Sequence, residues 1–250
     1  MKALMGCATL ALALLLTGCG EESGSGGAVA AGNGTGEIAA IPAPNGGDWT
    51  EVVTRSADGG FVMGNPQAPV KLVEYASLTC PACASFSTTA TEALENEYVR
   101  SGQVSWEFRN FVLNSVDLGV SMLVRCQDPN AFFRSVEQLY ATQPQWLAAF
   151  QTIPAAEQQR LQTLPPEQQV GALIKAGGAD SFFRQRGMPQ ARVDACLADQ
   201  QALERLVQMT GTASERDKVT GTPSFLINGV LVDNVTTWAE LEPRLRATIG

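Results

Sequence analysis

The pattern of apolar and polar residues predicts short strands separated by helices. Residues 52–54 and 60–63 are two weak strand candidates on either side of a turn, and residues 70–75 form a stronger one, Val-Lys-Leu-Val-Glu-Tyr. From residue 81 to about residue 100 the apolar positions follow helical spacing, and a Ser-Gly pair ends the pattern. Residues 104–111 alternate again and carry three large aromatic side chains, so they predict a second core strand.

The second half of the chain begins with a long helical block. From residue 115 to about residue 218 the chain is rich in Ala, Leu and Gln. Proline is favourable at the first position of a helix, so the prolines that divide this stretch predict helix starts: Pro129, Pro144, Pro154, Pro165, Pro166 and Pro189. Residues 224–227 and 230–232 predict two strands joined by Asn-Gly, a strong hairpin signal. Thr237 and Glu240 form a capping box that opens a last helix.

The first residues have the pattern of a targeting segment. Lys2 precedes an uncharged apolar run at residues 8–16, which is too short to cross a bilayer as a helix. The run ends in Leu-Thr-Gly-Cys19, which resembles the bacterial lipobox, where the cysteine is lipidated after cleavage before it. We therefore expect residues 1–18 to be a lipoprotein signal peptide and Cys19 to carry the lipid. The alternative is ordinary secretory cleavage further along, after Ala30.

Residues 20–47 have the composition of a flexible linker. Nine of these 28 residues are Gly and six are Ala, and such a stretch buries too little apolar surface to offset its ordering entropy. We expect residues 19–47 to be a tether with an r.m.s. span of roughly 30 Å and residues 48–250 to be the folded domain. Gly, not Asp, follows Cys19, and the usual lipoprotein sorting pattern then favours the outer membrane, with the domain on its periplasmic side.

Composition and charge exclude several classes of function. The chain has 250 residues, 45% of them hydrophobic, which is enough for one large domain with a sizeable core. Seventeen Lys and Arg stand against 25 Asp and Glu, and this net charge of −8 predicts no nucleic-acid partner. The absence of histidine excludes a Ser-His-Asp triad, a Cys-His pair and His-ligated zinc or haem. Any catalytic groups must therefore be cysteines, carboxylates, hydroxyls or backbone groups.

One motif, Cys80-Pro81-Ala82-Cys83, concentrates this chemistry. It follows a predicted strand and opens a predicted helix. Cys80 would lie near the N-cap, where free N–H groups and the helix dipole favour a thiolate, and Pro81 suits the first helical position. Two thiols at this spacing can close a disulfide with little backbone movement. We expect a redox role; a structural disulfide and half of a zinc site are the alternatives, because zinc sites use the same spacing.

A carboxylate inside the strand at residues 70–75 is the second unusual feature. Val70, Leu72, Glu74 and Ala76 would share one face of this strand, because side chains alternate along a strand. A charged residue is rarely buried in a central strand. Glu74 is therefore either a functional residue or a charged residue at a partly exposed sheet edge.

A third element, Gly221-Thr222-Pro223-Ser224, precedes the predicted hairpin. The cysteine motif after a strand, the long helical block, and a Thr-Pro before a hairpin and final helix together resemble the DsbA-like thiol-disulfide oxidoreductases of the thioredoxin-fold superfamily. The likeness covers about residues 49–250 and includes two tripeptides beside the core strands, Gly64-Asn65-Pro66 and Arg109-Asn110-Phe111. It implies an α/β thioredoxin fold, a central mixed sheet flanked by helices, with a helical insertion at about residues 113–210.

The resemblance also implies roles for single residues. In this family the proline before the hairpin is cis and faces the disulfide, and the residue before it pairs with the substrate backbone. Thr222 and Pro223 would then bind substrate, together with Pro81 and Ala82. A buried acid beneath the second cysteine moves its proton in these proteins, and Glu74 is in that place. The best-known members have His where this chain has Ala82, so strong oxidising power is not implied, although thiol exchange is.

Cys126 and Cys196 lie in the helical block. Some DsbA-like proteins carry a second bridge there, and the resemblance would pair these two cysteines as a structural disulfide. Four thiols allow three connectivities, and two buried free thiols are the alternative. In the chain-entropy model, closing a loop of this length stabilises the fold by roughly 4 kcal/mol.

We therefore expect an exported thiol-disulfide oxidoreductase without a cofactor or metal. Cys80 would exchange with substrate through a mixed disulfide, and Cys83 would resolve it. A moderate dithiol oxidase is the favoured direction. Reductases and isomerases share these residues, but known isomerases of this type have an N-terminal dimerisation domain where this chain has a tether, so an isomerase is less favoured. We expect a monomer.

The expected partners are reduced or unfolded exported proteins, a membrane redox protein (a quinone-linked oxidase or a reductase) and the membrane itself, through the lipid. Two rival functions remain open. One is a copper-type metal-handling lipoprotein, because Cys-x-x-Cys binds soft ions. The other is a thioredoxin-fold binding module without turnover.

Overall fold

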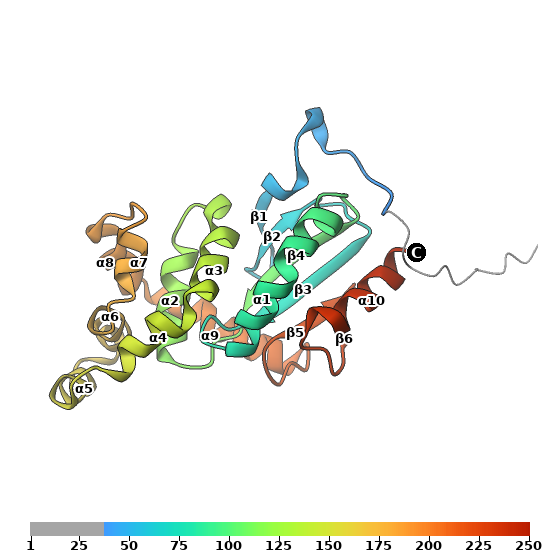
Figure 1. The fold of residues 1–250 in the computed structure, drawn as a ribbon. Coiled ribbons are helices and arrows are strands. Elements are labelled where there is room, and N and C mark those ends of the chain that lie inside the picture. The colour runs from blue at the N-terminus through green and yellow to red at the C-terminus, as the bar shows by residue number, and fades with distance from the viewer. Residues whose placement is uncertain (1–37) are drawn as a thin grey trace, which may run out of the picture. The chain divides into compact units, whose positions relative to one another are not determined.

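A mixed sheet of six strands lies at the centre of this computed structural model, which describes residues 38–250 (Figure 1). The strand order is β1-β2-β4-β3-β5-β6. β3 and β4 run parallel, and every other neighbouring pair is antiparallel. The strands are β1 (Val53–Arg55), β2 (Phe61–Gly64), β3 (Val70–Ala76), β4 (Val104–Asn110), β5 (Ser224–Ile227) and β6 (Val230–Val232). All six strands predicted from the residue pattern are confirmed, and so is the mixed α/β sheet.

Both faces of β3 are buried, because the sheet is covered on both sides. Leu72 and Ala76 belong to the large apolar cluster on one face, and Glu74 shares that face as predicted. Val73 and Tyr75 belong to a smaller cluster on the other face. The strand therefore lies in the middle of the sheet, between β4 and β5, and delivers the chain to the cysteine motif that follows it.

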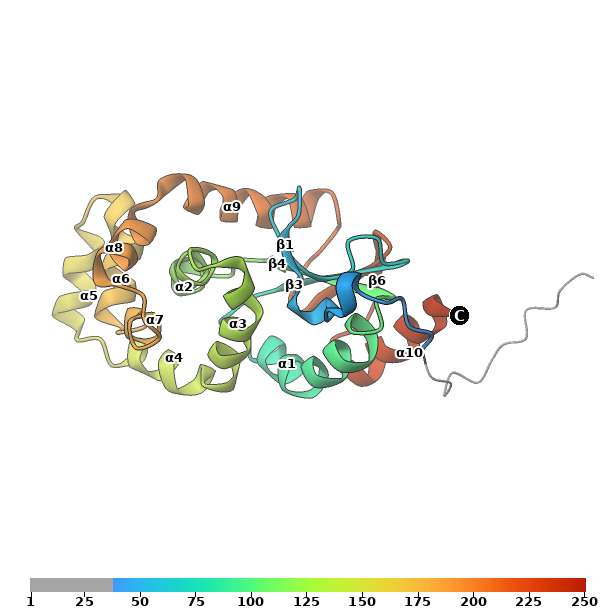
Figure 2. The same ribbon diagram turned by 90° about the horizontal axis from the view of Figure 1, so that it is seen from above.

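Helices cover the two faces of the sheet (Figure 2). On one face lie α1 (Pro81–Ala93), its π-helical continuation η3 (Leu94–Val99) and α10 (Trp238–Ile249). On the other face lies the end of α9 (Gln200–Glu215), which contributes Ala213 to the smaller cluster. The helix predicted from residue 81 to about residue 100 is thus confirmed, and the capping box of Thr237 and Glu240 opens α10.

The insertion between β4 and β5 is helical throughout its length. Its elements are α2 (Ser115–Arg125), η4 (Pro129–Ala131), α3 (Phe132–Ala141), α4 (Gln143–Gln151), α5 (Ala155–Gln162), α6 (Pro166–Ala176), α7 (Asp180–Arg184), α8 (Gln190–Ala198) and α9. Prolines stand at or directly before the first residues of η4, α5, α6 and α8, and Pro144 is the second residue of α4, so they mark helix starts as predicted. Their fixed φ angle and missing N–H suit these positions.

A disulfide between Cys126 and Cys196 closes this block, with their Cα atoms 6.1 Å apart. It joins the C-cap of α2 to α8. The pairing implied by the family resemblance is therefore present. Because α8 lies far along the chain from α2, the bridge restricts the unfolded chain strongly.

The predicted signal peptide, Cys19 and residues 19–37 of the predicted tether lie outside the described residues. The last part of that tether contacts the domain. The amide of Ile41 donates to the carbonyl of Ser101 at 2.6 Å, and the side chain of Gln103 donates to the carbonyl of Ala39 at 2.8 Å. Ile38 also packs against the large apolar cluster, so contacts of the domain extend to residue 38, ahead of the predicted boundary at residue 48. None of the helices within residues 38–250 is long and apolar enough to span a bilayer.

Candidate redox site

Cys80 is the N-cap of α1, with Pro81 in the first helical position. Both cysteines of the motif are free thiols in this structure. Cys83 is fully buried, whereas Cys80 keeps 9% of its surface exposed and Pro81 and Ala82 beside it are exposed. The first cysteine is therefore the one that another molecule can reach.

Two side chains of the helical insertion hold the loop that leads into the motif. Gln143, at the start of α4, donates its side-chain N–H groups to the carbonyls of Leu78 at 2.9 Å and Cys80 at 3.0 Å. The hydroxyl of Tyr140 in α3 donates to the carbonyl of Ser77 at 3.0 Å. These bonds add to backbone bonds at the same carbonyls, because the Cys80 carbonyl also accepts the amide of Ala84 in α1 and the Ser77 carbonyl accepts the amide of Cys80. Sequence reasoning missed both residues, because nothing in the local pattern links them to a loop so far away in the chain.

The Thr222–Pro223 peptide bond is cis, as the resemblance implied. It places the carbonyl of Thr222 3.3 Å from the Cys80 sulfur, within reach of the thiol proton. The hydroxyl of Thr222 is buried and has no hydrogen-bond partner in the described chain. The predicted site residues Cys80, Pro81, Thr222 and Pro223 thus meet at one end of the sheet.

The two thiols have opposite electrostatic environments. The Cys83 thiol donates to the Cys80 sulfur, and this bond contributes most to lowering the pKa of Cys80 to about 5; burial opposes it. The backbone N–H groups of Cys83 and Ala82 lower it further. Burial, the bond to Cys80 and the charges of Cys80 and Glu74 instead raise the pKa of Cys83 well above that of a free thiol. At neutral pH the site therefore holds a thiolate on Cys80 and a thiol on Cys83.

Glu74 is a buried acid, with 1% of its surface exposed. The indole N–H of Trp106 on the neighbouring strand donates to its carboxyl at 3.0 Å. Burial raises the pKa of Glu74 to about 8, and the bond from Trp106 offsets only part of that rise. The alternative of a charge at an exposed sheet edge does not hold. Trp106 was predicted as a core aromatic; in the parallel register of β3 and β4 it pairs with Leu72, two residues before Glu74 on the same face of the strand.

The remaining predicted sites lie apart from this one. Cys126 and Cys196 form their own bridge inside the helical block. In residues 38–250, no three Cys, Asp or Glu side chains come close enough together to hold a metal ion.

The fold and the cysteine geometry agree with comparisons to known proteins. A family model described as thioredoxin matches residues 56–246. The chain belongs to the thioredoxin family. Among solved members, a Novosphingobium aromaticivorans protein titled protein-disulfide isomerase is 31% identical, with a TM-score of 0.71 over 76% of this chain and 96% of that chain. Alpha-DsbA1 of Wolbachia pipientis is 19% identical, with a TM-score of 0.60 over 84% of this chain and 94% of that chain, a likeness of fold.

Curated proteins also match this thioredoxin-family chain, over smaller shares of their own lengths. A Rickettsia prowazekii protein that is provisionally named a protein-disulfide oxidoreductase is 27% identical over 186 residues, which are 74% of this chain and 60% of that protein. Disulfide bond formation protein D of Bacillus subtilis is 28% identical over 93 residues, 36% of this chain and 42% of that protein. The chain thus spans about three fifths of the length of the Rickettsia relatives it matches.

Proposed function

We propose that this chain is a thiol-disulfide oxidoreductase that exchanges disulfides with protein substrates through Cys80 and Cys83. The observation that carries the proposal is the contrast between the two thiols. The pKa of Cys80 is lowered to about 5, and the residues beside it, Pro81 and Ala82, are exposed. Cys83 is buried, and its pKa is raised. A structural disulfide needs no such contrast. The names of the Rickettsia and Bacillus relatives support the same activity.

In the oxidising direction the exchange has two steps. A substrate thiolate attacks the Cys80 sulfur of the Cys80–Cys83 disulfide, so a mixed disulfide forms and the Cys83 sulfur leaves with the electron pair and takes a proton. A second substrate thiolate then attacks the substrate sulfur of the mixed disulfide, and Cys80 leaves as a thiolate. The substrate gains a disulfide and the motif gains two electrons. The low pKa of Cys80 favours the second step, because a stable thiolate is a good leaving group.

Glu74 is the proton carrier for Cys83 in this scheme. Its carboxyl is buried on the same face of the sheet, and its charge raises the pKa of the Cys83 thiol. With a pKa of about 8 the carboxyl holds a proton at neutral pH that it can give to the leaving sulfur. In the reverse direction the carboxylate takes that proton back.

Substrate would lie across the exposed surface beside Cys80. Pro81 and Ala82 are exposed beside the sulfur of Cys80, and the Thr222 backbone approaches the same sulfur from the other side. We assign the substrate backbone to Thr222 and Pro223, and the flanking contacts to Pro81 and Ala82.

We favour a moderate dithiol oxidase, with a reduction potential between the values of about −120 mV for DsbA and about −270 mV for thioredoxin. A glutathione redox titration of the Cys80–Cys83 pair measures it. A potential at or below that of thioredoxin would contradict an oxidase and favour a reductase. Catalysed oxidation of a reduced dithiol peptide should accompany the expected potential, and a protein that only binds the peptide would show no turnover.

Isomerase activity is the second candidate, because the Novosphingobium relative carries that name at 31% identity. Reactivation of scrambled ribonuclease in a glutathione buffer separates the two activities. An oxidase shows little reactivation, while an isomerase restores most of the activity without a net change in disulfide number.

We also propose that the protein is exported and held on the periplasmic side of a membrane by a lipid on Cys19, with the outer membrane favoured. A Leu-Thr-Gly-Cys sequence after a short apolar run supports this. Its partners would be reduced exported proteins and a membrane redox protein that recycles the motif. Radiolabelled palmitate should enter the wild type and not Cys19→Ala; no label in the wild type would contradict the anchor. Metal analysis after reducing purification tests the rival copper-handling function, which predicts about one copper per chain.

A further inference from the structure

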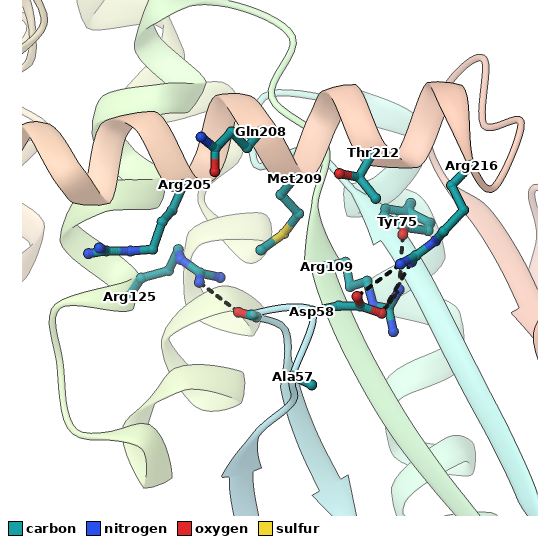
Figure 3. Close-up of a pocket in the computed structure, with 11 residues that line it drawn as sticks. Ala57, Asp58, Tyr75, Arg109, Arg125, Arg205, Gln208, Met209, Thr212 and Arg216 are labelled. Carbon is teal, nitrogen blue, oxygen red and sulfur yellow. Dashed lines mark hydrogen bonds and ion pairs between the residues drawn. The ribbon is translucent and has the colours of Figure 1, made fainter.

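A pocket of about 240 Å³ lies between the turn after β1, the end of α2 and one face of α9 (Figure 3). At one end its arginines are paired with acids. Arg109 contacts Glu107 at 2.7 Å and Asp58 at 2.9 Å. Arg216 contacts Asp58 at 2.9 Å and Asp217 at 2.8 Å. This end therefore carries no excess positive charge.

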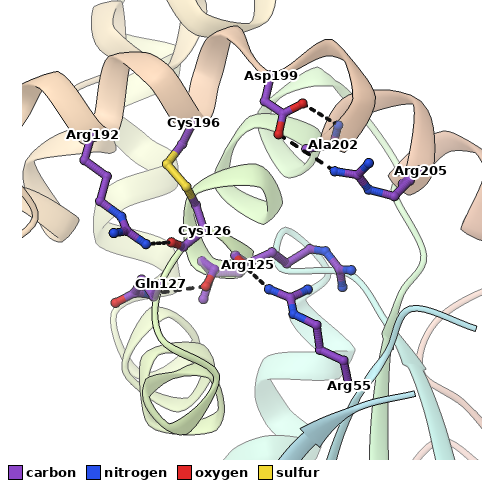
Figure 4. The surroundings of a disulfide bond; sticks show 10 residues. Arg55, Arg125, Cys126, Gln127, Arg192, Cys196, Asp199, Ala202 and Arg205 are labelled. Carbon is purple, nitrogen blue, oxygen red and sulfur yellow. Dashed lines mark hydrogen bonds and ion pairs between the residues drawn. A yellow bond between two sulfur atoms is a disulfide. The ribbon is translucent and has the colours of Figure 1, made fainter. Parts of the chain in front are cut away.

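At the other end, Arg125 of α2 and Arg205 of α9 line the pocket. Arg55 of β1 lies beside Arg125, outside the lining residues, and we call these three residues the arginine cluster (Figure 4). In the described part of the chain, neither Arg55 nor Arg125 is paired with a carboxylate. Arg205 has only Asp199, at 3.8 Å, and both side chains of that pair are about half exposed. Such a pair contributes little, so the cluster keeps nearly all of its positive charge.

Neutral groups hold the arginine cluster in place. Arg125 donates to the side-chain oxygen of Asn110 at 2.9 Å and to the carbonyl of Gly59 at 2.7 Å. Arg55 donates to the backbone carbonyl of Arg125 at 2.8 Å. The guanidinium carbons of Arg55 and Arg125 lie 4.3 Å and 5.2 Å from the centroid of the Phe61 ring, within cation–π distance. These contacts fix the positions of the charges without neutralising them.

The charges of the cluster repel one another. Burial, followed by the charges of Arg55 and Arg205, lowers the pKa of Arg125 to about 10. Burial and the charge of Arg205 also lower the pKa of Arg55. The groups still carry their charges at neutral pH. Although the chain has a net charge of −8, three positive charges that repel one another lie close together here. A bound anion would offset that repulsion.

We propose that the arginine cluster binds a tetrahedral oxyanion of the phosphate type. Guanidinium groups donate in planar forks that match phosphate oxygens. Three forks from three elements suit a tetrahedral group with several acceptor oxygens better than a planar carboxylate with two. The volume of about 240 Å³ accommodates a phosphate or pyrophosphate group.

The bound anion would contact the sheet through β1 and the helical insertion through α2 and α9. It would therefore cross-link the two parts of the domain on the side of the Cys126–Cys196 bridge (Figure 4). None of the residues that line the pocket belongs to the redox motif, so the site does not depend on the proposed exchange activity.

Thermal unfolding of the oxidised full-length chain in increasing inorganic phosphate, and separately pyrophosphate, tests the proposal, with sodium chloride holding the ionic strength constant. We expect the melting temperature to rise with the logarithm of the phosphate concentration once this exceeds the dissociation constant, by about 3–6 °C at about ten times that constant. Acetate, which is planar and monovalent, should give no such rise.

Arg205→Gln should remove the phosphate response. Its side chain is 58% exposed and it adds to the repulsion, so the variant should melt no lower than the wild type without phosphate. Arg55→Gln is a second variant with the same expected loss. Arg244→Gln removes the same charge from an exposed position on α10 and should keep the full response. No rise of the melting temperature in the wild type, or a rise of the same size in the wild type and Arg205→Gln, would overturn the proposal.

Sedimentation with vesicles distinguishes two sources of the phosphate group. Binding to phosphatidylglycerol vesicles but not to phosphatidylcholine vesicles, competed by free phosphate and lost in Arg205→Gln, identifies a lipid headgroup. A rise of the melting temperature with free phosphate, without vesicle binding, identifies a soluble anion. Vesicle binding that persists in Arg205→Gln without any response to free phosphate would overturn the proposal.

Discussion

Replacing Glu74 with Gln should remove a pH dependence of stability that the wild-type protein carries. Burial raises the pKa of Glu74 from 4.5 to about 8. Between these two values the folded protein holds a proton that the unfolded chain has released, so the free energy of unfolding falls as the pH rises. The contribution is complete below about pH 4.5 and is lost by the time the pH has passed through about 8.

The size of this effect follows from the same two pKa values. Integrated from pH 5 to pH 8, a single carboxyl with this shift lowers the free energy of unfolding by about 3.5 kcal/mol, an order-of-magnitude figure. Gln has nearly the same shape and can still accept the indole N–H of Trp106, but it does not titrate. Between pH 5 and pH 8, the free energy of unfolding of Glu74→Gln should therefore fall by about 3.5 kcal/mol less than that of the wild type.

Urea unfolding of the oxidised protein at several pH values between 5 and 8 measures the difference. In the oxidised form Cys80 and Cys83 are joined and do not titrate, so they add nothing to the slope. Glu137→Gln, an exposed glutamate on α3, is the matched control and should follow the wild type. If Glu74→Gln and the wild type lost stability in parallel, the carboxyl would not hold its proton in the folded state and the reasoning would fail.

The same substitution tests the proposed proton transfer. General acid–base catalysis contributes about 10²–10⁴-fold to a rate, so Glu74→Gln should slow the release of Cys83 from the disulfide by at least about 10²-fold. The dependence of that rate on a group with a pKa of about 8 should vanish. Stopped-flow mixing of the oxidised protein with a thiol peptide measures both. An unchanged pH profile would assign Glu74 a structural role only.

Three further predictions concern the cysteines. The rate of alkylation of Cys80 by iodoacetamide should reach half of its maximum near pH 5. Cys80→Ser should abolish exchange, and Cys83→Ser should accumulate mixed disulfides. Activity retained in Cys80→Ser would contradict the assignment. If Ala82→His stabilises the thiolate by about 1.4 kcal/mol, the reduction potential should rise by about 30 mV and the pKa of Cys80 fall by about one unit, and a pKa that moves without the potential would refute the link. Cys126→Ala should lower the free energy of unfolding by about 2–5 kcal/mol in urea titrations and leave exchange intact, so an unchanged midpoint would contradict a stabilising bridge.

The features that sequence reasoning captured are those set by local physical rules. Alternation along a strand placed Glu74 on the core face of β3, and the structure confirms that burial. The prolines marked helix starts, because their missing N–H is harmless only there. The cis bond before Pro223 and the pairing of Cys126 with Cys196 came from the family resemblance, and no local rule would have supplied either.

The features that sequence reasoning missed join residues far apart in the chain. Arg55, Arg125 and Arg205 are separated by long stretches, and only the packing of α2 and α9 against the β1–β2 turn gathers them. The net charge of −8 pointed away from any cationic site, because a sum over the chain says nothing about its distribution. The contacts of Ala39 and Ile41 were missed because a Gly- and Ala-rich composition has few side chains that could predict them.

The helical insertion is part of the redox site as well as a covering layer. Gln143 and Tyr140 of the insertion fix the carbonyls of the loop that positions Cys80, and Asp117 of α2 accepts the amide of Leu78 in the same loop at 3.0 Å. A loop held in this way keeps the N-terminus of α1 directed at the Cys80 sulfur. The Cys83 thiol contributes most to lowering the pKa of Cys80, and the backbone N–H groups of Cys83 and Ala82 lower it further. None of these groups is a histidine, which is why an Ala in the third position of the motif is compatible with a stabilised thiolate.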